Sequence, residues 1–137
     1  MTTEGLGLIS DTNTLRAMIV EDNIALAETL GWMIEALGYD YAIVNTGTQA
    51  LADAAIFRPH VMMIDIGLPD MTGYDLCKRL RADPSLAETV FVAQTGWDEH
   101  SHGTQSRDAG FHHHLTKPVS IEKLENLLKD LQADLVK

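Results

Sequence analysis

Short apolar runs alternate with longer segments of helical periodicity, and this alternation constrains the fold more than any other feature of the sequence. Each run is too short for a helix, so each is expected to form a strand. Strands that alternate with helices predict an α/β fold with a parallel sheet, right-handed crossovers and helices on both faces. The expected strands are Leu15 to Val20, Tyr41 to Val44, Val61 to Ile64, Val90 to Ala93 and a weaker run before Lys117.

The segments between the runs predict five helices. Gly38 is a C-cap candidate for the first helix, prolines limit the second and third, and Ser120 is an N-cap candidate for the fifth. The fourth has almost no apolar face and is expected to be marginal. In chain order the helices are expected over Leu26 to Leu37, Ala50 to Phe57, Gly73 to Ala82, Asp98 to Ala109 and Ile121 to Leu135.

Length and charge limit the possible functions. The 137 residues suit one domain, with residues 1–14 as a loose lead-in or linker and residues 15–137 as the folded unit. The net charge of -10 repels nucleic acid and anionic membrane surfaces, so neither is expected as a partner. No apolar run is long enough to span a bilayer, and the first ten residues do not resemble a secretory signal. The single cysteine, Cys77, agrees with a reducing cytoplasm.

Reactive side chains follow the expected strands. Glu21 and Asp22 come after the first strand, Asp65 after the third, Thr95 after the fourth and Lys117 after the fifth. The carboxyl ends of parallel strands meet at one edge of a sheet, where ligands bind in such folds. We therefore expect three carboxylates, a hydroxyl and an ammonium to converge there.

Such a cluster needs a positive charge to hold it together. Two carboxylates 4 Å apart repel by about 4 kcal/mol at an effective dielectric constant near 20. Lys117 supplies one positive charge, so the site remains negative and should recruit a hard divalent cation, for which Mg²⁺ fits best. An acidic, metal-neutralised pocket suits phosphoryl transfer, with Asp65 as the natural nucleophile.

Four motifs in this order resemble those of the receiver domains of two-component signalling, such as the bacterial chemotaxis response regulator. The resemblance covers roughly residues 15–136 and implies a flavodoxin-like, doubly wound sheet of five parallel strands in the order 2-1-3-4-5. The motifs are Glu21-Asp22-Asn23, the loop from Asp65 to Gly73, Gln94-Thr95-Gly96 and Leu115-Thr116-Lys117-Pro118.

The resemblance implies roles for the residues of the expected site. Asp65 would accept a phosphoryl group from a phosphohistidine of a sensor histidine kinase or a histidine phosphotransfer protein. Asp22, Asp65 and the carbonyl of Gly67 would bind Mg²⁺, with Glu21 acting through a metal-bound water. Lys117 and Thr95 would contact the phosphoryl oxygens, and Thr95 would move inward when they arrive.

The resemblance also implies a switch surface on the fourth helix, fifth strand and fifth helix. An aromatic residue usually lies three positions before the lysine, but His114 occupies that position here. Its charge could make the output pH-dependent, although a partly solvated side chain on an edge strand is the preferred interpretation.

Gly67 and Trp97 lie two positions beyond the acceptor and the threonine, where the family tunes attack of water on the acyl phosphate. Neither side chain can orient that water except through the indole N–H, so a comparatively long-lived phosphoryl state is expected. Trp97 could instead cap the pocket or contact a partner.

The single cysteine and the remaining histidines are not expected to belong to the site. Cys77 is expected in the core or at its boundary. The five histidines at positions 100, 102, 112, 113 and 114 could bind a transition metal, but adventitiously. Within the run, His112 and His114 could share a ligand, whereas His113 would point to the opposite face.

Output from a chain with no following effector domain would travel by binding another protein, by dimerisation or by passing the phosphoryl group onward. One alternative is a receiver module excised from a hybrid histidine kinase and acting in a phosphorelay. A magnesium-dependent phosphohydrolase ranks lower, because Gly67 offers no acid-base carboxylate. A flavin binder also ranks low, because no Gly-rich or Ser/Thr-rich phosphate loop follows the first strand.

Overall fold

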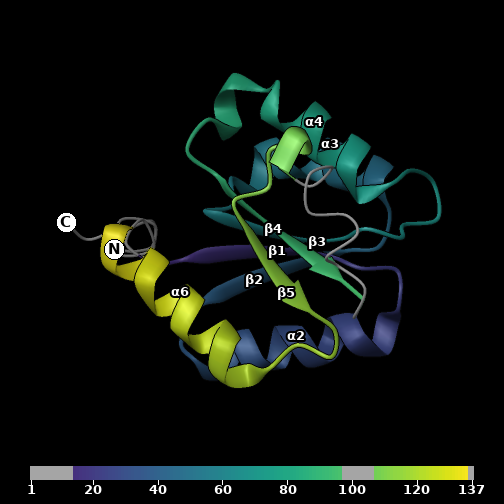
Figure 1. Ribbon diagram of the computed structural model, residues 1–137. Coiled ribbons are helices and arrows are strands. Elements are labelled where there is room, and N and C mark those ends of the chain that lie inside the picture. Colours follow the sequence, from purple (N-terminus) through teal and green to yellow (C-terminus); the bar gives the residue numbers. More distant parts are fainter. Residues whose placement is uncertain (1–13, 97–106, 136–137) are drawn as a thin grey trace.

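The computed structural model describes residues 14–96 and 107–135. Over these ranges five parallel strands form one sheet in the order β2-β1-β3-β4-β5 (Figure 1). The predicted flavodoxin-like fold class is confirmed. The proposed lead-in over residues 1–14 lies almost wholly outside the described residues. The strands are β1 (Arg16–Val20), β2 (Asp40–Val44), β3 (Val61–Asp65), β4 (Val90–Thr95) and β5 (His113–Thr116).

The helices agree closely with the predicted segments. Residues 107–109 are helical, and the rest of the marginal helix predicted over residues 98–109 lies outside the described ranges. Among the described residues no helix has both the length and the apolar character needed to cross a bilayer. The helices are α2 (Ile24–Ala36), α3 (Gly47–Phe57), α4 (Gly73–Arg81) and α6 (Ile121–Leu135), with a short 3-10 turn, η2 (Pro84–Leu86).

Capping side chains explain where the helices begin. The helix α3 starts at Gly47, earlier than predicted, because the Thr46 side chain accepts a hydrogen bond from the Gln49 N–H at 3.0 Å. In the same way, the Asn23 side chain accepts from the Leu26 N–H at 3.1 Å and sets the start of α2. The first residues of both helices are thus fixed by polar side chains two or three positions after β1 and β2.

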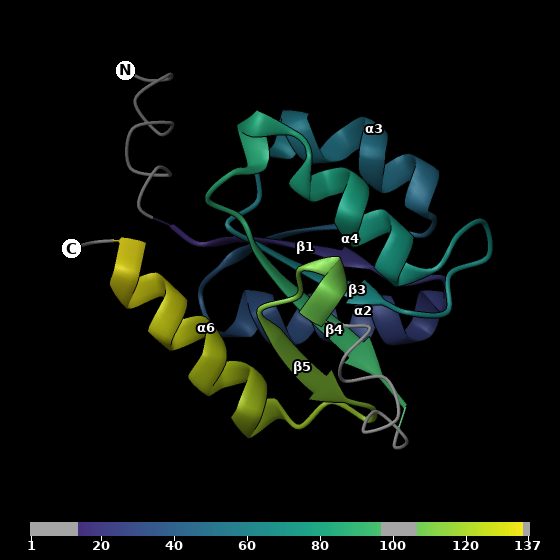
Figure 2. The ribbon, with the colours of Figure 1, turned by 45° about the horizontal axis from the view of Figure 1, so that its top comes forward.

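Helices cover both faces of the sheet, with α2 and α6 on one face and α3 and α4 on the other (Figures 1 and 2). Alternate residues of the central strands enter different cores, so Ile19 lies in the core that includes Leu124 of α6, and Met18 lies in the core that includes Leu76 of α4. Cys77 is fully buried in the α3–α4 core, as predicted, and burial raises the pKa of its thiol to about 12. This thiol is therefore structural.

Arg16, the charge inside the first apolar run, terminates α3. Its Nε donates to the carbonyl oxygens of Phe57 (3.2 Å) and Arg58 (3.0 Å), and its Nη2 donates to Arg58 at 2.8 Å. Arg58 ends the helix in a left-handed conformation with φ 56°. A guanidinium satisfies the unpaired carbonyls and the partial negative charge at a helix C-terminus. Arg16 thus lies away from the carboxyl ends of the strands.

Two histidines extend the strand pairings with their side chains. The His60 N–H donates to the Arg16 carbonyl at 2.8 Å, while its Nδ1 accepts from the Arg16 N–H at 2.9 Å. His112 is bonded to Phe91 in the same two ways, at 2.8 and 2.9 Å, and its ring stacks on that of Phe91. A ring nitrogen that accepts an N–H carries no proton, so these bonds favour neutral histidines.

The fold is expected to lose stability as the pH falls below about 6.5, the ordinary pKa of histidine. Burial and then Arg16 lower the pKa of His60, and burial, Arg81 and His113 lower that of His112. The unfolded chain therefore takes up these protons first on acidification. Stability present above that pH is lost as the pH falls through the lower pKa values of the folded state.

Urea unfolding at pH values of about 7.5 and 5.5 measures this loss as a lower midpoint at the acidic pH. The matched variant combines His60→Asn and His112→Asn, because an Asn Oδ1 accepts the same N–H without titrating in this range. Its midpoint should depend less on pH. An unchanged pH dependence would show that other groups cause the loss.

Candidate functional site

The carboxyl ends of four strands bring the predicted site residues to one edge of the sheet. Glu21 and Asp22 directly follow β1, and Asp65 is the last residue of β3. Thr95 ends β4, and Lys117 directly follows β5. Because β1 and β3 are neighbours, their acidic residues meet where the strand order reverses, which is the usual ligand position in this architecture.

Three carboxylates form a compact cluster at this edge. Glu21, Asp22 and Asp65 each offer an oxygen, and these oxygens all lie within 4.8 Å of one another. Glu21 is 1% exposed and Asp65 is 8% exposed, whereas Asp22 is exposed. Carboxylate oxygens are hard ligands and suit a hard divalent cation such as Mg²⁺. The cluster could therefore hold a metal ion on its open, Asp22 side.

Lys117 supplies the positive charge that the sequence predicted. Its Nζ lies 2.9 Å from Glu21 Oε1 and 2.9 Å from Asp65 Oδ1. Burial opposes the charge of this ammonium, but the two carboxylates outweigh burial and raise its pKa. One lysine thus joins the ends of β1, β3 and β5, and three carboxylates with one ammonium leave the cluster negative.

Burial raises the pKa of Glu21, while Lys117 and the Asn23 N–H, which donates to Oε2 at 3.1 Å, act to lower it. The charge of Asp65 raises it further. Burial thus disfavours the ionised form of Glu21. A cation bound in the cluster would offset both the cost of burying a charge on Glu21 and the repulsion between Glu21 and Asp65.

The loop after Asp65 is short and closed by its own backbone. The Gly67 N–H donates to Asp65 Oδ1 at 3.3 Å, and Gly67 forms an isolated antiparallel bridge with Thr72. The Gly73 N–H donates to the Ile66 carbonyl at 2.8 Å where α4 begins. These bonds hold the Gly67 backbone beside the Asp65 carboxylate.

Asp70 fastens this loop to α3, a role that the sequence analysis did not identify. Its Oδ1 accepts from the Gly47 N–H at 2.9 Å, and its Oδ2 accepts from the N–H and hydroxyl of Thr48 at 2.9 and 2.6 Å. The Thr48 hydroxyl bond and the two N–H bonds lower the pKa of Asp70 to about 2. An aspartate in a loop has many possible partners, and only its proximity to a helix N-terminus distinguishes this one.

The predicted switch residues lie at the ends of β4 and β5. Thr95 is 6% exposed, and its carbonyl accepts from the Lys117 N–H at 2.7 Å, which ties the lysine to β4. His114 pairs with Ala93 in the sheet and its side chain is exposed. Trp97, like the histidines at positions 100 and 102, lies outside the described residues.

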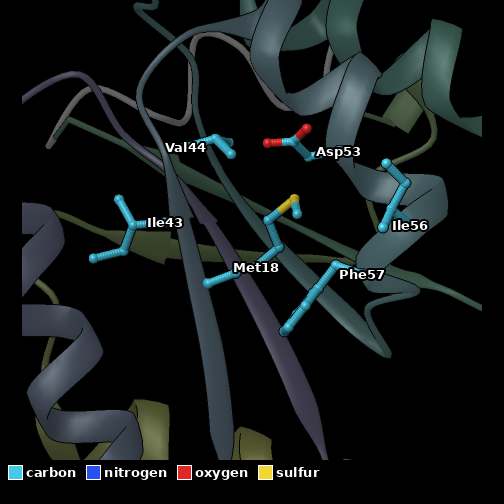
Figure 3. Close-up of a pocket in the computed structure, with 7 residues that line it drawn as sticks. Met18, Ile43, Val44, Asp53, Ile56 and Phe57 are labelled. Atoms are coloured by element: carbon cyan, nitrogen blue, oxygen red, sulfur yellow. The ribbon is translucent and has the colours of Figure 1, made fainter.

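A separate cleft of about 410 Å³ lies at the β2 edge of the sheet (Figure 3). Its walls are apolar side chains from β1, β2 and α3, with Asp53 as the single charged residue among those that line it. None of the carboxylate cluster lines this cleft. The polar edge and the apolar cleft are therefore distinct features of the molecule.

The family model for the response regulator receiver domain matches residues 17–129. The chain belongs to this family. The receiver domain is 33% identical to the DNA-binding response regulator MtrA of Mycobacterium bovis over 114 aligned residues. This alignment covers 83% of the chain and 49% of MtrA. It is 30% identical to the polar-differentiation response regulator DivK of Brucella anthropi over 117 aligned residues. This second alignment covers 85% of the chain and 95% of DivK.

Solved structures agree with this assignment. A receiver domain described as CheY-like, from Methylobacillus flagellatus, matches with a TM-score of 0.79 and 36% identity, covering 86% of this chain and 98% of that one. The chain spans about half the length of MtrA and nearly all of DivK. The comparisons confirm the resemblance: the chain is a receiver domain of two-component signalling.

Proposed function

We propose that this receiver domain accepts a phosphoryl group on Asp65 and works as a phosphorylation-dependent switch. The observation that carries the proposal is the pairing of Asp65 with Lys117 at 2.9 Å inside a cluster of three carboxylates. The donor would be a phosphohistidine of a sensor histidine kinase or of a histidine phosphotransfer protein.

In the proposed reaction a carboxylate oxygen of Asp65 attacks phosphorus. The bond from phosphorus to the donor imidazole nitrogen breaks, its electron pair stays on the imidazole, and an acyl phosphate forms. A bound Mg²⁺ would neutralise the charge of the phosphoryl oxygens. Asp22, Asp65 and the Gly67 carbonyl are the proposed ligands, with Glu21 acting through a water. Lys117 would stabilise the developing charge.

We further propose that the added charge changes a surface formed by β5, α6 and the segment predicted as the fourth helix, residues 98–109. This segment is distinct from α4. The phosphoryl group brings about -1.5 to -2 charges and new acceptor oxygens, which attract Lys117 and the Thr95 hydroxyl. The side chain of His114, on β5, would transmit this change by contacting a downstream protein or a second copy of the chain. We place the domain in the cytoplasm, with no nucleic acid or membrane partner.

Two exposed isoleucines support docking of a protein partner over the site. Ile24 is 56% exposed at the start of α2, and Ile121 is 54% exposed at the start of α6. These helices follow β1 and β5, which carry site residues, and cover the same face of the sheet. Apolar patches rimmed by polar residues mark protein contacts, and we propose that the two isoleucines belong to such a patch. A receiver module of a hybrid kinase would use the same contacts.

Incubation with Mg²⁺ and a small phosphodonor tests the proposed function. We expect intact mass spectrometry to show one added phosphoryl group, removable by hydroxylamine as an acyl phosphate is, and peptide mapping to place it on Asp65. The group should not form when a chelator removes Mg²⁺. Turnover of a phosphomonoester instead of a stable protein adduct would favour the phosphohydrolase alternative.

The phosphoryl state is expected to be comparatively long-lived, and Gly67→Asn should shorten its half-life. Among the described residues, a Cβ at Gly67 would meet no atom within 4 Å, so the position has room for a side chain, and Asn can orient an attacking water. Gly67→Ala is the matched control, because it adds a Cβ without a polar group. We expect hydrolysis of the labelled protein to be fastest in Gly67→Asn. Equal rates for all three proteins would refute this role of position 67.

A further inference from the structure

Gln94 is a polar residue at a fully buried position of β4, directly before Thr95. Its side chain is 0% exposed, and its backbone lies in register with Asp65 on β3 and Leu115 on β5. Residues in register on parallel strands direct their side chains to the same face of the sheet. Gln94 therefore lies between Asp65 and the core residue Leu115 on the same face of the sheet.

The Gln94 amide has no hydrogen-bond partner in the part of the chain that the structure describes. Both Oε1 and Nε2 are buried and unpaired. Most buried polar side-chain atoms are paired, and an unpaired one destabilises the fold, so each exception requires an explanation. An apolar side chain would suit this position better, because Val92, Leu115 and Leu124 form the core on the same face.

The Lys117 side chain spans the end of β4, the strand that carries Gln94. Lys117 starts at the end of β5 and reaches Asp65 at the end of β3, and β4 lies between these two strands. Its ammonium has three N–H donors, and the carboxylates of Glu21 and Asp65 lie 2.9 Å from it. A carboxamide offers both a donor and an acceptor, so Gln94 can pair with either partner of the Lys117–Asp65 contact when that contact loosens.

We propose that Gln94 is a positioning residue that is unpaired in the resting site and becomes paired in the phosphorylated site. This inference rests on the proposed function. Phosphorylation removes the negative charge from the Asp65 carboxyl group and places charge on the phosphoryl oxygens, which attract Lys117. The Asp65 carbonyl oxygen that Lys117 leaves then accepts a hydrogen bond from Gln94 Nε2. The unpaired amide thus biases the domain toward its phosphorylated state.

The test compares wild type with Gln94→Met, which replaces the amide by an apolar side chain of similar length. Without ligand, the variant should melt at a higher temperature, by about 3 to 8 °C, because an unpaired buried amide is removed. With Mg²⁺ and beryllofluoride, a mimic of the phosphoryl group, its gain in melting temperature should be smaller than that of wild type. Its apparent affinity for beryllofluoride should be about fivefold weaker, the equivalent of one lost hydrogen bond.

Thr89→Val is the matched control at the opposite end of β4. Thr89 is also buried, but its hydroxyl donates to the Pro59 carbonyl at 2.9 Å. Removing this satisfied group should lower the melting temperature and leave the beryllofluoride response intact. Gln94→Leu serves as a second variant if Gln94→Met does not fold.

The outcomes distinguish a failure of the role proposed for Gln94 from a failure of the proposed function. A lower melting temperature in both Gln94 variants without ligand would overturn the inference, because the amide would then be paired at rest. A higher melting temperature with an unchanged beryllofluoride response would also overturn it, because the amide would then be only a buried misfit. A wild type that does not respond to Mg²⁺ and beryllofluoride would contradict the proposed function instead.

Discussion

Asp65→Asn is expected to incorporate no phosphoryl group under conditions in which the wild type is labelled. The amide oxygen of Asn is a poor nucleophile, so the acyl phosphate cannot form. The change also removes one of three clustered carboxylates, and the affinity for Mg²⁺ should fall by at least about tenfold. Intact mass spectrometry measures the first effect, and titration of the intrinsic tryptophan fluorescence with Mg²⁺ measures the second.

Asp75→Asn is the matched control, because Asp75 is an exposed carboxylate in the first turn of α4. It should be labelled like the wild type. Asp65→Asn should also keep its fold, since the substitution is isosteric and removes a charge that repels Glu21. Undiminished labelling of Asp65→Asn would place the phosphoryl group on another residue and end the proposed mechanism.

The sequence predicted the site because the fold itself brings its residues together. Once Val61 to Ile64 and its neighbouring runs are recognised as parallel strands, Asp65 and Lys117 must lie at the same edge, although they are far apart in the chain. In the structure the Lys117 Nζ lies 2.9 Å from Asp65 Oδ1, as this reasoning predicts. The start of α3 was the least accurate boundary, because the cap at Thr46 overrides the apolar pattern.

Residues whose roles depend on side-chain geometry were not predictable in this way. The bonds from Asp70 to Gly47 and Thr48 span more than twenty positions of the chain and leave no periodic pattern. The unpaired state of Gln94 is a property of the folded core, since the sequence alone indicates only a polar residue near the end of a strand. His60 likewise resembles any histidine until its Nδ1 is seen to accept from β1.

The second large effect is expected for Gly73→Ala, at the junction of the acceptor loop and α4. A Cβ at this position would lie 2.7 Å from the Asp65 carbonyl oxygen and 2.8 Å from the Ile66 Cα, both backbone atoms. Backbone cannot move aside as a flexible side chain can, so the contact should destabilise the fold by about 2 to 3 kcal/mol. The better helix propensity of Ala offsets at most about 1 kcal/mol of this.

Urea unfolding of Gly73→Ala measures this loss as a lower midpoint with an unchanged slope. Gly67→Ala, in the same loop, is the control, because its Cβ would meet no atom of the described residues within 4 Å and stability should barely change. If Gly73→Ala relieves the contact by moving the loop, Asp65 moves relative to Lys117 and phosphorylation slows. A Gly73→Ala protein that is both as stable and as rapidly labelled as the wild type would show that the close packing of Gly73 on the Asp65 carbonyl is not needed to hold the acceptor in place.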